Sequence, residues 1–143
     1  MKAAVLYEQG KEHPFVNSNP LVVEDVDLEP PGNDEVLIKT GAAGLCHSDL
    51  SMIRGVMERK VPMVPGHEAA GIVEEVGKNV TQCRPGDHVV MSFVPICGRC
   101  EYCTTGRPNL CSTAFNARAT GALINGNRRL SLNATALHHT NGI

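Results

Sequence analysis

Hydrophobic and polar residues alternate along the chain in short runs, a pattern typical of β-strands that bury one face. Runs of this kind, bounded by glycine, proline, asparagine and aspartate, predict strands at residues 2–7, 21–28, 35–43, 69–76 and 88–94. A short helix is expected at 48–54. The dipeptide Asn125-Gly126, between two strand-like flanks, predicts a β-hairpin. Many short strands at turn-marked intervals favour a mainly β barrel with little helix.

The composition fits one domain with an aliphatic core. The chain has 143 residues, of which 42% are hydrophobic and only 3% aromatic, with no tryptophan. Thirteen basic residues face 15 acidic ones, and the net charge of −2 argues against a nucleic-acid partner. No apolar run is long enough for a membrane helix and no signal segment precedes the first strand, so a cytoplasmic protein without membrane contact is expected.

Four of the six cysteines indicate a metal site rather than disulfides. Cys97, Cys100 and Cys103 are separated by two residues each, and Cys111 follows shortly after. Tetrahedral zinc takes four thiolates on such a loop, which makes a closed, structural site and defines a zinc lobe at about 95–112. An iron–sulfur cluster fits less well, because the ferredoxin spacing closes with a cysteine three residues on and a proline, which this chain lacks. A thioredoxin-like redox pair would need a strand–helix context that is missing here. Four unconnected structural cysteines would be an unusual coincidence in so short a segment.

A second group of residues has the chemistry of a catalytic zinc site. Cys46 and His67 are ligand types that zinc accepts, and the carboxylates of Asp49 and Glu68 lie close to them in the sequence. A ligating histidine usually donates its other ring N–H to a carboxylate, a role open to either acid. By residue type alone, an isolated cysteine and an isolated histidine are also ordinary packing residues, so both interpretations stand.

Four segments together resemble the zinc-containing alcohol dehydrogenases of the medium-chain family. They are Gly44-Leu45-Cys46-His47-Ser48-Asp49, Gly66-His67-Glu68-Ala69-Ala70-Gly71 with Gly77 and Val80, Pro85-Gly86-Asp87-His88-Val89, and the cysteine-rich segment with Asn109-Leu110-Cys111. The similarity runs in order from residue 1 to about 137. It implies a GroES-like catalytic domain, a partly open β-barrel with short helices and a zinc-binding loop, over residues 1–143.

The resemblance assigns a role to each matching residue of the second group. Cys46 and His67 would ligate the catalytic zinc, with Glu68 beside the metal, and Asp49 would hydrogen-bond His67. Ser48 would accept the alcohol proton as the first member of a relay.

In the same comparison His47 falls where the family contacts the cofactor pyrophosphate, and it can also act as a proton group near neutral pH. Cys97, Cys100, Cys103 and Cys111 would hold the structural zinc.

The activity implied by the resemblance is oxidation of a small alcohol to an aldehyde or ketone. Zinc would act as the Lewis acid and NAD or NADP would accept the hydride, in a protein expected to be a homo-oligomer at full length. Residues 112–132 are closest to the branch of thiol-dependent formaldehyde dehydrogenases, which remains an alternative within the enzyme class. The alternative outside the enzyme class is a stand-alone zinc-stabilised β-barrel that has a binding or structural role and no catalytic activity.

Several positions depart from the family pattern. The third catalytic ligand, a cysteine in the family, is expected downstream of residue 143, and Cys83 does not replace it. No Gly-x-Gly-x-x-Gly motif occurs, so the nucleotide-binding Rossmann domain is absent and the chain is expected to be an inactive front portion of a dehydrogenase. Ser51 stands where several relatives have a relay histidine. Two further pairs of residues are not expected to have a functional role. Arg128-Arg129 is expected on a solvated strand face, and His138-His139 is expected in a loop.

Overall fold

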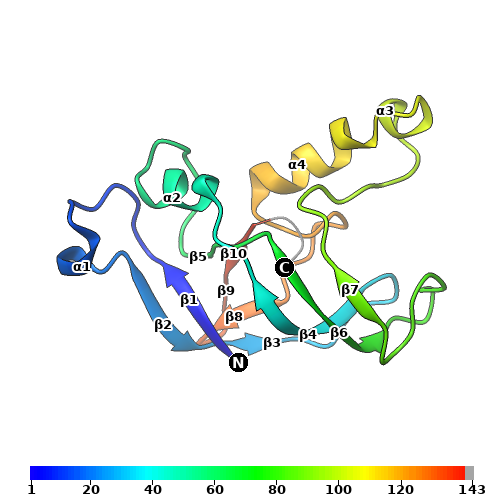
Figure 1. The fold of residues 1–143 in the computed structure, drawn as a ribbon, viewed down its shortest axis with the longest axis horizontal. Coiled ribbons are helices and arrows are strands. Elements are labelled where there is room, and N and C mark those ends of the chain that lie inside the picture. Colours follow the sequence, from blue (N-terminus) through cyan, green and yellow to red (C-terminus); the bar gives the residue numbers. More distant parts are fainter. Residues whose placement is uncertain (141–143) are drawn as a thin grey trace.

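The strands form three small sheets rather than one closed barrel. The computed structural model describes residues 1–140. The first sheet has the order β10-β5-β1-β2, the second β3-β8-β9 and the third β4-β6-β7 (Figure 1). Their bounds are β1 (Lys2–Leu6), β2 (Leu21–Asp25), β3 (Asp27–Leu28), β4 (Val36–Ala43), β5 (Met63–Val64), β6 (Ala69–Val76), β7 (His88–Val90), β8 (Leu130–Leu132), β9 (Thr135–Ala136) and β10 (His138–His139). This mainly β, partly open architecture with short helices confirms the predicted fold class.

The strand predicted at 21–28 is divided in two at Val26. Before Val26 the chain pairs with β1, and after it the chain pairs with β8 in a different sheet. The Val26 side chain is buried, and its backbone exchanges hydrogen bonds with Met1, whose amino group donates to the Val26 carbonyl at 2.7 Å. A single residue therefore moves the chain from one sheet to the next.

Helix α2 (His47–Ile53) lies where a short helix was predicted, and four other helical segments were missed. These are α1 (Phe15–Ser18), α3 (Glu101–Thr104), the 3-10 turn η1 (Pro108–Leu110) and α4 (Ser112–Thr120). Helix α4 buries only Ala114 and Ala117 while Phe115 is 71% exposed, so its sequence carries no helical hydrophobic period. It ends at Gly121, where φ is +63° and an added Cβ would meet the His138 side chain at 2.8 Å.

The prediction of a hairpin at Asn125-Gly126 is wrong in its position. Leu123 and Asn127 close a turn there with a 2.9 Å backbone hydrogen bond, but no strands flank it. The hairpin lies instead between β8 and β9, with Asn133 at φ +49° and Ala134 at φ +64°. Two left-handed residues in succession are the geometry of a tight hairpin turn. The Asn125 side chain is engaged elsewhere, in a hydrogen bond to Glu35.

The core is aliphatic, as the composition predicts. One cluster joins Ala3 and Val5 of β1 to Val26, Leu130 and Leu137. A second consists of Leu6, Met52 and Met63, each at most 1% exposed. Because Met52 belongs to α2, this second cluster fastens the helix that carries Ser48 and Asp49 to the first sheet.

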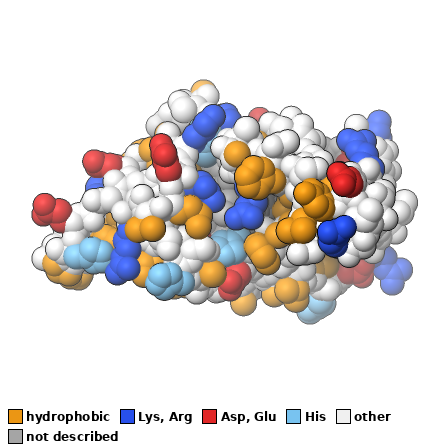
Figure 2. Space-filling model, turned by 90° about the horizontal axis from the view of Figure 1, so that it is seen from above, with side chains coloured by type: hydrophobic (Ala, Val, Ile, Leu, Met, Phe, Trp, Pro, Cys, Tyr) orange, Lys and Arg blue, Asp and Glu red, His pale blue; other side chains and the backbone are white. Residues whose placement is uncertain are grey.

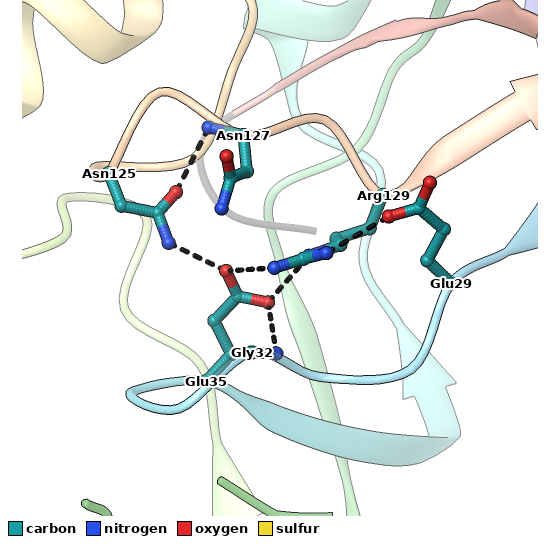
Figure 3. A network of polar contacts seen from close by, with 6 residues as sticks. All are labelled: Glu29, Gly32, Glu35, Asn125, Asn127 and Arg129. Carbon is teal, nitrogen blue, oxygen red and sulfur yellow. Dashed lines mark hydrogen bonds and ion pairs between the residues drawn. The ribbon is translucent and has the colours of Figure 1, made fainter.

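Arg129 joins the loop before β4 to the segment before β8 (Figure 3). Its guanidinium donates to both oxygens of Glu35, at 2.9 and 3.2 Å, and to Glu29 at 2.9 Å. The Gly32 N–H and the Asn125 amide also donate to Glu35. Burial raises the pKa of the Glu35 carboxyl, but these hydrogen bonds outweigh it and hold the pKa at about 2. With a side chain only 25% exposed, Arg129 does not lie on a solvated face, and that prediction is wrong.

His139 lies in β10 and is 3% exposed, so the prediction of a loop for this pair is also wrong. Burial, with the positive charge of Arg128 nearby, lowers its pKa to about 4. An unfolded histidine titrates near 6.5, so between that pH and about 4 the unfolded chain binds a proton that the folded chain does not.

We therefore expect the free energy of unfolding to fall as pH falls from 6.5 towards 4, and the fall to be smaller in His139→Asn. Urea unfolding of both proteins at pH 7.5, 5.5 and 4.5 measures it. Parallel curves for the two proteins across this range would contradict the assignment, and His13→Asn serves as the control for an exposed histidine.

No helix within residues 1–140 combines the length and apolar character that crossing a membrane requires.

Candidate metal centres

The four cysteines predicted to bind zinc converge in the structure. Their sulfurs all lie within 4.8 Å of one another, with Cys100 Sγ 3.5 Å from Cys103 Sγ and 3.9 Å from Cys111 Sγ. Four sulfurs at 2.3 Å from a tetrahedral zinc are about 3.8 Å apart, so this donor set fits the ion. Short segments position it: Gly98 turns the chain at φ +72°, α3 carries Cys103, and η1 leads into Cys111.

The thiols of this cluster differ in acidity. The Cys103 backbone N–H and the Ser112 hydroxyl lower the pKa of Cys100 to about 5, and the Thr113 hydroxyl lowers that of Cys97 to about 7. Burial and the neighbouring Cys100 sulfur raise the pKa of Cys103 to about 12. The first thiolate thus forms readily, and further thiolates beside it need a cation to balance them.

Asp49 links the start of α2 to His67. Its Oδ2 accepts a hydrogen bond from the Cys46 N–H at 3.1 Å, which satisfies a free donor at the helix N-terminus. Its Oδ1 lies 3.2 Å from His67 Nδ1, and neither atom has another polar partner within residues 1–140. Both side chains are buried, at 6% and 8% exposure. The carboxylate therefore favours a proton on Nδ1 and leaves the lone pair of Nε2 for the opposite side.

The opposite side of the His67 ring carries the remaining candidate ligands. His67 Nε2 lies 3.2 Å from Ser48 Oγ and 3.9 Å from Glu68 Oε1. Ligand atoms of Cys46, His67 and Glu68 lie within 4.8 Å of one another. A thiolate, an imidazole and a carboxylate form a donor set that suits zinc, so these residues fit the ion as well.

These side chains open into a cavity of about 210 Å³. Its lining consists of Cys46, Ser48, Met52, Met57, Arg59, His67, Glu68, Phe93, Arg118 and Thr140. Of the residues predicted for the site, Cys46, Ser48, His67 and Glu68 line the cavity and Asp49 lies behind His67, whereas His47 is exposed and outside the lining.

Sequence reasoning missed Arg59, Arg118 and Phe93 as cavity residues. They belong to no motif and come from segments that meet only in the folded chain. Cys83 joins neither metal cluster in the part of the chain described.

Comparison with known proteins identifies the family. The model of the alcohol dehydrogenase GroES-like domain matches residues 32–137, most of the chain. The chain belongs to this family. The NDMA-dependent alcohol dehydrogenase of Amycolatopsis methanolica is 53% identical over 110 residues, 77% of this chain and 28% of that protein. An S-(hydroxymethyl)glutathione dehydrogenase of Escherichia coli is 39% identical over 142 residues, 99% of this chain and 36% of that protein.

Solved structures agree with this assignment. An alcohol dehydrogenase zinc-binding domain protein from Burkholderia ambifaria superimposes with a TM-score of 0.84 at 35% identity, covering 98% of this chain and 36% of that one. The GroES-like chain thus spans between 28% and 36% of the length of these relatives. The resemblance read from the motifs is confirmed.

Proposed function

We propose that this GroES-like chain forms part of the catalytic domain of a zinc-dependent alcohol dehydrogenase that transfers hydride from an alcohol to NAD+ or NADP+. Residues 1–143 would belong to this GroES-like catalytic domain without completing it, and residues at about 95–112 would form its zinc lobe. The observation that carries the proposal is the convergence of Cys46, Ser48, His67 and Glu68 on one cavity, with Asp49 behind His67. The alcohol dehydrogenases among its relatives support it.

The two metal clusters would have different tasks. Cys97, Cys100, Cys103 and Cys111 fill all four positions of a tetrahedral ion, so this cluster organises the lobe and takes no substrate. Cys46 and His67 would hold the catalytic ion, with Glu68 beside it. Zinc bound there supplies a Lewis acid that polarises the alcohol oxygen.

The chain's own residues orient this site and manage the proton. Asp49 fixes the His67 ring so that Nε2 faces the cavity. Ser48 Oγ lies at the cavity wall, where it can accept the alcohol proton. The products are an aldehyde or ketone, the reduced nicotinamide and one proton, which leaves from Ser48 to water or to exposed His47.

His47 is also the proposed contact for the cofactor pyrophosphate, and its exposure at the start of α2 leaves it accessible. The proposal includes a cytoplasmic location, because zinc–thiolate clusters persist in a reducing compartment. It also includes a homo-oligomer at full length. The E. coli relative supports a thiol-bound hydroxymethyl group as one substrate.

The test is a chimaera in which residues 1–140 of this chain replace the corresponding part of the E. coli relative. We expect alcohol-dependent reduction of NAD+ or NADP+, followed at 340 nm. Ser48→Ala should lower kcat about 10²-fold or more, the scale of one positioned proton-transfer group. Ser131→Ala, in β8 and outside the cavity, is the matched control.

The outcomes separate an enzyme from a binding module. The 143-residue chain alone is expected to show no turnover, since it carries no Gly-x-Gly-x-x-Gly motif. A chimaera that folds and binds zinc at both clusters but reduces no nicotinamide would favour the zinc-stabilised module without catalysis.

A further inference from the structure

Gln9 reaches from the loop after β1 to the segment that forms one wall of the cavity. Its amide nitrogen donates to the carbonyl of Met52 at 2.5 Å and to that of Met57 at 2.9 Å, and its amide oxygen accepts the Arg59 N–H at 2.9 Å. These partners lie 43 to 50 positions away in the sequence. The amide of Gln9 thus has a partner for both of its N–H groups and for its oxygen.

All three partners of Gln9 line the cavity, although Gln9 itself does not. Met52 belongs to α2, whereas Met57 and Arg59 come from the segment between α2 and β5. Figure 2 shows the face that carries α2 and α4, with apolar and basic side chains close together near its middle. Gln9 therefore acts on the shape of the cavity from outside its lining.

Beyond Met57 the backbone of this wall segment depends on Gln9. No helix or strand is described between α2 and β5. Within residues 1–140, the bond to Gln9 is the only hydrogen bond made by a backbone N–H in the stretch 58–61. The Gly10 N–H donates to the Ile53 carbonyl at 2.8 Å, which holds the loop that carries Gln9 against the end of α2. Gln9 is thus itself anchored where it supports the wall.

The amide of Gln9 joins a fixed part of the wall to a less fixed part. Met52 is 1% exposed and belongs to the second core cluster, so packing holds it in place. Met57 is only partly buried where it packs against that cluster. Without the amide, the Met57 carbonyl and the Arg59 N–H would lose these partners and turn towards water, and the segment would move.

We propose that Gln9 is a positioning residue of the cavity wall, and that through it the site discriminates between alcohols by the length of their hydrocarbon chain. The inference rests on the proposed function for the hydroxyl end of the alcohol, at Ser48 and His67. Because Gln9 holds Met57 in the lining, an alcohol long enough to reach Met57 gains apolar contact there. Ethanol, with two carbons, gains little.

The first test compares ethanol and hexan-1-ol as substrates of the chimaera with the E. coli relative. Gln9→Met keeps the length of the side chain but lacks the amide. It should raise KM for hexan-1-ol about tenfold, the scale of one methylene group lost from an apolar contact. KM for ethanol and kcat for both alcohols should stay within about twofold, because Ser48 and His67 at the reacting end are unchanged.

The second test needs no turnover and uses the zinc-loaded 143-residue chain. Exchange of the Arg59 amide hydrogen, followed by NMR, should be at least about tenfold faster in Gln9→Met, because its acceptor is lost. Titration with hexan-1-ol, followed at the methyl signal of Met57, should show about tenfold weaker binding in the same variant.

Gln82→Met is the matched control, because Gln82 is exposed and lies outside the cavity lining. Gln9→Asn carries the same amide on a side chain one methylene group shorter, which cannot reach all three partners, and it should show part of the effect. Circular dichroism checks that each variant folds. If Gln9→Met does not fold, Gln9→Asn decides.

Three results would overturn the inference: KM values for ethanol and hexan-1-ol that rise by the same factor, a fall in kcat alone, or hexan-1-ol binding that Gln9→Met does not weaken. A general loss of structure would affect both alcohols alike, so the first result marks a merely structural role.

Failure of the proposed function has a different signature. An inactive chimaera together with hexan-1-ol binding that depends on Gln9 would retain the positioning role and reject the dehydrogenase. An active chimaera in which Gln9→Met leaves KM for hexan-1-ol unchanged would do the reverse.

Discussion

Replacing Cys100 by serine is expected to abolish tight zinc binding at the four-cysteine cluster and to unfold the lobe at 95–112. The lobe has little else to hold it. Of its residues only Cys111 is buried, while Ile96 and Leu110 are at least half exposed. Its helical segments, α3 of four residues and η1 of three, are far too short to form alone. Structural zinc contributes about 10–16 kcal/mol of apparent binding energy in comparable small sites.

Zinc content after dialysis against a chelator measures the effect, together with the rate of proteolysis in the lobe. The wild type should retain one tightly held zinc per chain, with the ion at Cys46 and His67 held more weakly. Cys83→Ser is the matched control, because Cys83 joins neither cluster in the described part of the chain. A Cys100→Ser protein that keeps a full equivalent of zinc and resists protease would refute the prediction.

Arg129→Met is expected to destabilise the fold by about 2 kcal/mol, less than for a fully buried pair because solvent reaches the site. The change leaves the Glu35 carboxylate, only 13% exposed, without its main partner. It also removes the hydrogen bonds that join two segments lying 94 residues apart in the sequence. Urea unfolding at pH 7 measures the loss.

A double-mutant cycle identifies the source of the effect. Adding Glu35→Gln to Arg129→Met should recover part of the loss, because the remaining charge is removed. Arg84→Met is the control: its pair with Asp87 is 87% exposed on the arginine side and should matter by less than about 0.5 kcal/mol. Equal losses in Arg84→Met and Arg129→Met would contradict the prediction.

Acid should act through the same network. The pKa of Glu35 is depressed to about 2, against 4.3 for an unperturbed glutamate, so its stabilisation is present above about pH 4.5 and disappears as pH falls towards 2. The pH range in which protonation of Glu35 destabilises the fold lies below the range for His139. The two contributions to the free energy of unfolding can therefore be separated.

The convergence of the four cysteines was predictable because three of them lie in one contiguous segment. Two-residue gaps bring Cys97, Cys100 and Cys103 to one loop whatever the rest of the chain does. Asp49 and His67 are different, because nothing in their spacing places a carboxylate behind an imidazole 18 positions away. Residue chemistry left either Asp49 or Glu68 open as the partner of His67, and only the likeness of whole segments to a family selected Asp49.

The remaining features of the cavity could not be predicted, because they depend on contacts between segments that are distant in the sequence. Arg59 and Arg118 are unremarkable in their local sequence, and they line the same cavity only because distant segments meet in the folded chain. Helix α4 gives no periodic signal, since small alanines form its buried side. At Val26 the alternation of apolar and acidic residues continues without a break while the chain changes its sheet, because pairing partners, not side-chain alternation, decide where a strand ends.

The double use of Asp49 has a kinetic consequence. One carboxylate both accepts the Cys46 N–H that starts α2 and steadies the ring of His67. Fraying of the first helical turn would displace this carboxylate, and the imidazole would lose its orientation in the same movement. At the proposed metal site, release of an ion from Cys46 and His67 would therefore be coupled to the opening of this first helical turn.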